Sequence, residues 1–166
     1  MSVQKPGKRR PPKPTIGWRE WLALPLLGVD RIKAKIDTGA RTSSLHAFDL
    51  ERFRRRGVDM VRFKIHPVQR DLVRTVDAEA RLVDERWVRD SGGTATLRPV
   101  IHTDVHLLGQ TWEIELTLTC RDVMGFRMLL GRQAVRRRFL IDPGRSYFGE
   151  KARRGGKAAR RAKERA

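Results

Sequence analysis

Cysteine is almost absent from this chain of 166 residues, which contains Cys120 alone. A single thiol forms no disulfide within the chain, and it provides no cysteine cluster for a structural zinc site. A reducing compartment is the simpler explanation, so we expect a cytoplasmic protein. No segment approaches the roughly 18 apolar residues that a membrane-spanning helix needs. The basic, proline-rich N-terminus lacks the apolar core of a secretory signal. We therefore expect no membrane partner.

Two motifs of cofactor-dependent enzymes are absent as well. The chain has no His-Glu-x-x-His sequence of a zinc peptidase and no Gly-x-x-x-x-Gly-Lys-Ser/Thr loop for nucleotide phosphates. His102, Asp104 and His106 do share one face of a predicted strand, and zinc accepts these side chains as ligands. A solvated strand face, opposite apolar neighbours, is the preferred interpretation. We predict no metal site and no cofactor.

Acidic residues are few: 19 Asp and Glu stand against 37 Lys and Arg, which gives a net charge of +18. Residues 1–14 carry +5 and residues 151–166 carry +7, which leaves +6 for residues 15–150. Many charges and few large apolar residues predict that both ends are disordered tails around one domain at 15–150. Basic tails attract polyanions, so RNA or ribosomes are candidate partners. A purely solubilising role remains the alternative.

The domain is predicted to be mostly β. Apolar and charged residues alternate over 31–36, 61–65 and 112–119, with period two. Residues 18–27 form a further apolar strand that Pro25 breaks, and residues 87–97 form a hairpin around the tip Ser91-Gly92-Gly93. Residues 131–138 are expected to form one short helix. The pattern assigns loops or weak strands to residues 49–60 and 68–86.

The chemically distinctive segment is Asp37-Thr38-Gly39-Ala40, which follows the alternating strand 31–36. A carboxylate, a small hydroxyl and a glycine suit a tight turn that presents Asp37 from a rigid support, where catalytic groups work best. An aspartate that only caps a turn is the alternative. Far along the chain stands a second motif, Leu130-Gly131-Arg132.

Together these motifs resemble the retropepsin-like aspartic proteases, in particular a bacterial branch often labelled "ATP-dependent zinc protease". The match extends over residues 35–46, 98–100, 129–132 and 140–143, within a likeness that covers roughly residues 16–148. The resemblance implies a mostly β acid-protease barrel with one short helix after Gly131. It also implies an aspartic-type endopeptidase.

Peptide hydrolysis by carboxylates needs two of them sharing one proton, because one accepts a proton from water while the other supports the carbonyl oxygen. The chain holds a single Asp-Thr-Gly, so we predict a homodimer in which the two copies of Asp37 meet on the two-fold axis. By resemblance, Thr38 hydrogen-bonds across the dimer and Gly39 allows close backbone approach. The second motif, Leu130-Gly131-Arg132, supports the loop.

Substrate contacts are predicted by the same resemblance for residues after the motif and for the hairpin tip, which are Ala40, Arg41, Ser91, Gly92 and Gly93. Viral retropepsins place an acid at the position of Arg41, where it pairs with the arginine of the second motif. We therefore expect Arg132 to find another acid, and the pocket beside Asp37 to be positive. His46 follows the loop closely, but we do not predict a catalytic role for it.

A positive pocket favours an acidic peptide or protein substrate. The bacterial branch is often encoded beside ATP-grasp ligases that add glutamates to proteins, so a glutamate-rich tail is the predicted substrate class. Alternatively, Arg41 pairs with Asp122 or Glu79 and never meets substrate. The rival function is a non-catalytic module that binds RNA or ribosomes on the same scaffold, because the large positive charge is not required for catalysis.

Overall fold

The computed structural model describes residues 11–90, 92–120 and 125–150. This part of the chain is mostly β, with two very short helices. Its elements, in chain order, are β1 (Thr15–Gly17), β2 (Arg19–Leu24), the 3₁₀ helix η1 (Pro25–Leu27), β3 (Val29–Asp37), β4 (Ser43–His46), β5 (Phe48–Arg55), β6 (Val58–Ile65), β7 (Val76–Arg81), β8 (Asp84–Arg89), β9 (Ala95–Leu107), β10 (Gln110–Thr119), β11 (Met128–Gly131), α1 (Arg132–Val135) and β12 (Leu140–Asp142).

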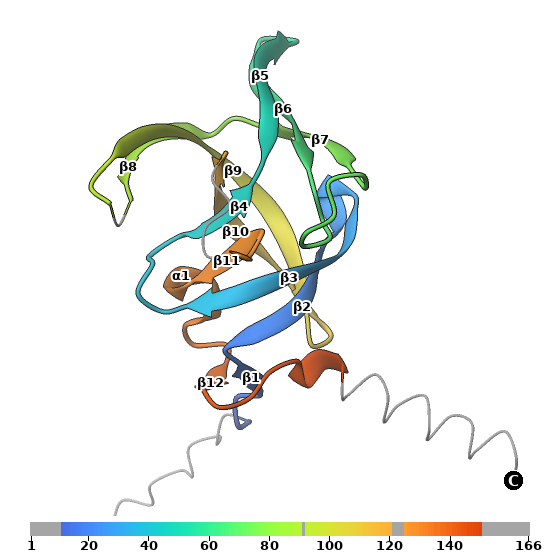
Figure 1. Cartoon of the computed structure of the whole chain (residues 1–166), viewed down its shortest axis with the longest axis vertical. Helices are drawn as coiled ribbons and strands as arrows, with labels where there is room; N and C mark the ends of the chain where they lie inside the picture. Colours follow the sequence, from blue (N-terminus) through green and yellow to red (C-terminus); the bar gives the residue numbers. More distant parts are fainter. Residues whose placement is uncertain (1–10, 91, 121–124, 151–166) are drawn as a thin grey trace, which may run out of the picture.

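Seven strands of the described residues form the main sheet, in the order β10-β4-β11-β3-β2-β9-β8. The first strand of this order, β10, also pairs with β9, so the sheet curls back on itself around the core. β11 lies between β3 and β4 and runs parallel to β3. The arrangement inserts a strand from late in the sequence beside the strand that carries Asp37 (Figure 1).

The core is built by the alternation that the sequence predicts. On β3, Ile32, Ala34 and Ile36 are buried, while the residues between them reach the outer surface. On β10, Trp112, Ile114, Leu116 and Leu118 are buried in the same way. The predicted strands at 31–36 and 112–119 are therefore confirmed, because one face of each is removed from water.

A second, three-stranded sheet, β5-β6-β7, differs from the loops or weak strands predicted for 49–60 and 68–86. The β5–β6 hairpin projects from the fold at the end opposite β1 and β12 (Figure 1). A register shift between Phe48 and Glu51 interrupts the alternation of β5, which explains why the pattern was missed. Cross-strand ion pairs tie the sheet together, with Arg62 binding both Glu51 and Glu79.

Two further predictions need correction in detail. The apolar segment 18–27 is not one strand, because Pro25 begins the helix η1 after β2 ends at Leu24. The helix predicted for 131–138 is only four residues long. It ends because Arg136 leaves the helical conformation and Arg137 takes a positive φ of 66°.

The chain ends of the described part are tied to β2 by a buried carboxylate. Glu20 is fully buried. Its Oε1 accepts hydrogen bonds from the backbone N–H of Gly17 at 2.8 Å and of Phe148 at 2.9 Å, and its Oε2 accepts one from Gly149 at 3.4 Å. These donors satisfy a group that would otherwise be costly to bury. Among the described residues, no helix is long and apolar enough to cross a membrane.

Candidate active site

Asp37 is the last residue of β3, and it opens the turn that the sequence predicts. Its Oδ1 accepts hydrogen bonds from the backbone N–H of Gly39 and of Ala40, each at 3.1 Å. Among the described residues, Oδ2 has no hydrogen-bond partner. The side chain is half-buried. One carboxylate oxygen is thus fixed by the turn at the end of β3, while the other is left without a hydrogen bond there.

The segment formed by β11 and α1 holds the backbone of this turn in place. Gly131 stands beside Asp37 in the parallel register of β11 and β3. The N–H of Arg132 donates to the carbonyl of Ala40 at 2.8 Å, and the N–H of Gln133 donates to the carbonyl of Arg41 at 3.1 Å. These bonds use donors at the start of α1 that have no partner within the helix.

Arg132 acts on the same turn through its side chain. Its guanidinium donates to the carbonyl of Thr38 at 2.9 Å. We expected this arginine to bind another acid, but within the described residues it binds a backbone carbonyl instead. The planar, multi-donor guanidinium can brace a loop through a carbonyl as well as through a carboxylate.

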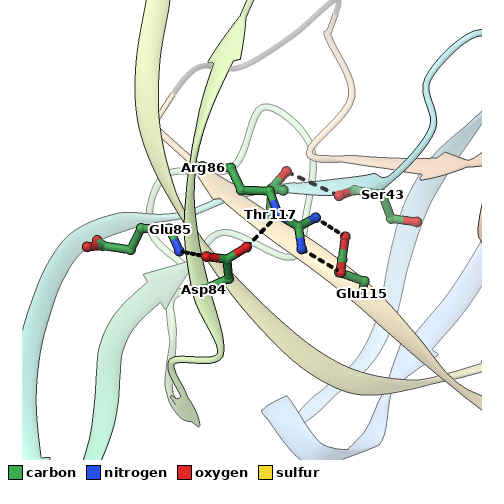
Figure 2. A network of polar contacts seen from close by, with 6 residues as sticks. All are labelled: Ser43, Asp84, Glu85, Arg86, Glu115 and Thr117. Carbon is green, nitrogen blue, oxygen red and sulfur yellow. Dashed lines mark hydrogen bonds and ion pairs between the residues drawn. The ribbon is translucent and has the colours of Figure 1, made fainter.

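Gly131 sits where no side chain fits. A Cβ built on it would lie 2.5 Å from both the carbonyl carbon and the oxygen of Thr42, closer than carbon atoms approach without a backbone shift. The contact is locked by Ser43, whose Oγ accepts a hydrogen bond from the Gly131 N–H at 3.0 Å. The carbonyl of Ser43 accepts another from the Thr117 hydroxyl at 3.2 Å, as Figure 2 shows.

Beside the turn opens a hollow of about 770 Å³, lined by Arg41, Ser43, Arg86, Glu115 and Gln133 among others. Figure 2 shows that Arg86 reaches two carboxylates: its guanidinium binds both oxygens of Glu115, and its Nε donates to Asp84 at 2.7 Å. These bonds, with Glu115 foremost, raise the pKa of Arg86. The guanidinium of Arg86 is therefore already bound by carboxylates of the chain itself.

Arg41 differs from Arg86 in this respect. It is exposed at the hollow, and its side chain has no hydrogen-bond or ion-pair partner among the described residues. Glu79, which the sequence offered as its partner, instead binds Arg55 and Arg62 on the second sheet. Asp122, the other offered partner, lies outside the described residues. Arg41 is thus an exposed cation at the hollow with no partner among the described residues.

The hairpin β8–β9 is present as predicted for residues 87–97. Gly92 and Gly93 lie exposed at its tip, while Ser91 lies outside the described residues. Asp90 shapes the tip, since its carbonyl accepts from the Gly93 N–H at 3.0 Å and its Oδ1 accepts from the Thr94 N–H at 2.9 Å. The β8 strand of this hairpin, through Arg86, lines the same hollow as Arg41.

The three histidines that the sequence analysis considers are not among the residues that line this hollow. His102 Nδ1 lies 3.5 Å from a carboxylate oxygen of Glu113, and His106 Nδ1 lies 2.7 Å from the Thr111 hydroxyl, both across β9 and β10. His46 stacks on Phe48. Sequence reasoning missed Arg86 and Glu115, which are 29 residues apart in the sequence and pair between β8 and β10. No local pattern in the sequence signals that pairing.

Comparison with known proteins gives a family match and a structural likeness. A family model described as RimB-like, retropepsin-like aspartic endopeptidase RimB, matches residues 15–152. A crystal structure of a protein of unknown function from Legionella pneumophila superimposes with a TM-score of 0.69 at 24% identity, covering 82% of this chain and 98% of that one. That likeness shows the fold alone.

Two relatives from bacteria are named probable alpha-L-glutamate ligase. The protein of Shewanella pealeana is 47% identical over 137 residues, which are 82% of this chain and 30% of the relative. The protein of Desulfotalea psychrophila is 41% identical over 158 residues, which are 87% of this chain and 34% of the relative. The chain thus spans about a third of the length of these relatives.

The close approach at Gly131 generates a prediction about stability. Gly131→Ala should lower the free energy of unfolding by about 3 kcal/mol, because the new methyl group meets backbone atoms that cannot turn away. Gly144→Ala is the matched control, since its Cβ would make an ordinary 3.4 Å contact with the Asp142 side chain. Its effect should stay within about 0.5 kcal/mol. Urea unfolding measures both, and equal midpoints would contradict the prediction.

Proposed function

Because the chain belongs to the RimB-like family of retropepsin-like aspartic endopeptidases, we propose that it is an aspartic-type peptidase that works as a homodimer. The observation that carries the proposal is the geometry of Asp37. Its carboxylate stands at a strand end, with one oxygen held by two backbone amides and the turn braced by Arg132. Such preorganisation is what a catalytic carboxylate requires.

The proposed chemistry needs a second carboxylate, and the chain has one Asp-Thr-Gly motif. In the dimer the two copies of Asp37 share a proton, because like charges at short distance cannot both ionise. The ionised member accepts a proton from the attacking water, while the protonated member donates to the carbonyl oxygen of the scissile bond. When the peptide bond breaks, the member that took the proton from water donates it to the departing amine. The other member takes back a proton from a hydroxyl of the tetrahedral intermediate, which restores the shared-proton pair. Thr38, exposed beside Asp37, is proposed to hydrogen-bond across the dimer.

For the substrate we propose glutamate-rich protein tails. Arg41 supports this class, because it is an exposed guanidinium without a partner among the described residues at the hollow beside Asp37. Guanidinium groups bind carboxylates bidentately. The names of the two relatives also support it, since they connect sequences of this kind with the addition of glutamate. The peptidase would remove what such a ligase adds.

The first test replaces the catalytic carboxylate. Asp37→Asn should reduce hydrolysis of a glutamate-tailed protein at least about 100-fold, because the shared proton is lost while the turn keeps its acceptor oxygen. Asp71→Asn is the matched control. Asp71 Oδ1 also accepts N–H groups two and three residues ahead, from Val73 at 2.8 Å and Arg74 at 3.2 Å, and these bonds lower its pKa.

The control should keep its activity, and both variants should keep wild-type circular dichroism. If Asp37→Asn cleaves as fast as Asp71→Asn, the aspartate of the motif only shapes a turn, and the peptidase proposal is wrong. A chain that binds RNA or ribosomes without cleaving any peptide would favour the non-catalytic module.

The second test concerns the dimer. Specific activity should fall on dilution, because the site exists only when two chains associate. Mixing wild type with a ninefold excess of Asp37→Asn should lower activity per wild-type chain about tenfold, since random pairing leaves only about 1% of dimers with two aspartates. Undiminished activity in both measurements, made with the same peptide, would show that single chains are catalytic.

The third test concerns substrate charge. Arg41→Glu should reduce the preference for acidic over neutral residues beside the cleaved bond by about tenfold in kcat/KM, because attraction becomes repulsion. Arg81→Glu, which makes the same charge change at an exposed position of β7, is the control. A cleavage assay on a peptide library measures the preference. If both variants lose it equally, net charge and not the hollow selects the substrate.

A further inference from the structure

The outer face of β3 carries a row of cations that ends at Asp37. Ile32, Ala34 and Ile36 are buried in the core, so the residues between them share the opposite face. That face presents Arg31, Lys33, Lys35 and then Asp37. We call Arg31 and Lys33 the cationic row; Lys35, on the same face, has an interaction of its own. At about 3.3 Å per residue, it begins roughly 20 Å from the carboxylate.

The neighbouring strand β2 supports the row with an aromatic ring. In the antiparallel register, Trp21 stands beside Lys33. The guanidinium of Arg31 lies 4.1 Å from the centre of the Trp21 ring, and the ammonium of Lys33 lies 5.4 Å from it. Cations held over an indole ring keep their charge and lose little further freedom when they bind an anion.

The segment just before residue 151 completes this face. Tyr147 stacks on Trp21 with ring centres 6.0 Å apart, and Ser146 Oγ accepts a hydrogen bond from Arg19 Nε at 3.1 Å. Tyr147 adopts a φ of 60°, a conformation that non-glycine residues rarely take. The buried Glu20, which binds the next two backbone amides, holds the segment in this place. Contacts from several elements therefore hold the side chains on this face of β3 in place.

At the outer end of the row, the chain's own Glu150 binds Arg31. The pair borders a hollow of about 610 Å³ that Trp21, His106 and Gly109 also line. The pair shows that the guanidinium of Arg31 can bind a carboxylate. Both partners remain partly exposed, with 51% of the Arg31 side chain and 32% of the Glu150 side chain accessible. A ligand carboxylate could therefore compete for the same position.

We propose that the cationic row binds the distal part of an acidic peptide whose scissile bond lies at Asp37. The inference rests on the proposed function and extends it to substrate length. An extended peptide covers about 3.3–3.6 Å per residue, so about six residues separate Asp37 from Arg31. Glutamates up to this distance add affinity by pairing with Lys33 and then Arg31, and Glu150 holds the last position until a longer substrate displaces it.

A single-stranded nucleic acid fits the row less well. Nucleic-acid platforms offer open aromatic faces on which bases stack. Here Trp21 is already contacted by Tyr147, Arg31 and Lys33, so the surface presents charges more than ring faces. The row also ends at a carboxylate, which suits a peptide delivered to hydrolysis and repels a continuing phosphate chain.

The test measures binding separately from cleavage. Fluorescein-labelled α-linked oligo-L-glutamates of two to ten residues are titrated with the full chain carrying Asp37→Asn, and fluorescence anisotropy is recorded at fixed salt. Affinity should rise with length and level off at about six to eight residues. Arg31→Gln with Lys33→Gln should weaken the longest peptide about fivefold and flatten the length dependence. Glu150→Gln should strengthen the long peptides and leave the dipeptide unchanged.

The matched control is Arg54→Gln with Lys64→Gln, which removes the same charge from an exposed position of β5 and a half-buried one of β6 and leaves both chain ends intact. Equal weakening by the control, or affinity without a plateau, overturns the proposal. So does tighter binding of an oligouridylate of equal charge at the row. If wild type cleaves none of these peptides although the row binds them with the expected length dependence, the proposed function fails and the binding site stands.

Discussion

The contact between Gly131 and the backbone of Thr42 is the constraint on which the candidate site depends. With no Cβ at Gly131, β11 lies close enough for its N–H to reach Ser43 and for the next two amides to reach the Asp37 turn. The turn then fixes one oxygen of Asp37. Because a packed strand and not a free loop sets these positions, the carboxylate is held at a defined place.

Because the chain has an excess of positive charge, it matters which arginines are paired with carboxylates and which are not. Most described carboxylates are paired with cations, as Glu115 is with Arg86 and Glu79 is with Arg55 and Arg62. The charge of Arg86 is thereby compensated by carboxylates of the chain, while Arg41 on the same hollow has no such partner among the described residues. Net charge alone therefore says little about where an acidic ligand binds. The distribution of acids among the cations selects the positions at which attraction remains.

The sequence predicts the parts of this fold in which local pattern and burial agree. Alternation identifies β3 and β10, and the glycine turn identifies Asp37. It does not predict β5, because a register shift and charged cross-strand pairs remove the apolar period. It overestimates α1, because the backbone of Arg137 turns to a positive φ, which no residue type there signals. Arg86 and Glu115 stand on β8 and β10, which both pair with β9, so their contact needs the folded chain.

The buried Glu20 connects stability with the surface that leads to Asp37. Burying a carboxylate is unfavourable unless donors satisfy it, and here the donors are the backbone amides of Gly17, Phe148 and Gly149. The same bonds hold Tyr147 in its strained conformation, against Trp21. A residue of the core thus determines whether Arg19 and Arg31 are oriented on the outer face, where segment 146–150 binds them both. Loosening that segment would change the cationic row without altering any residue within it.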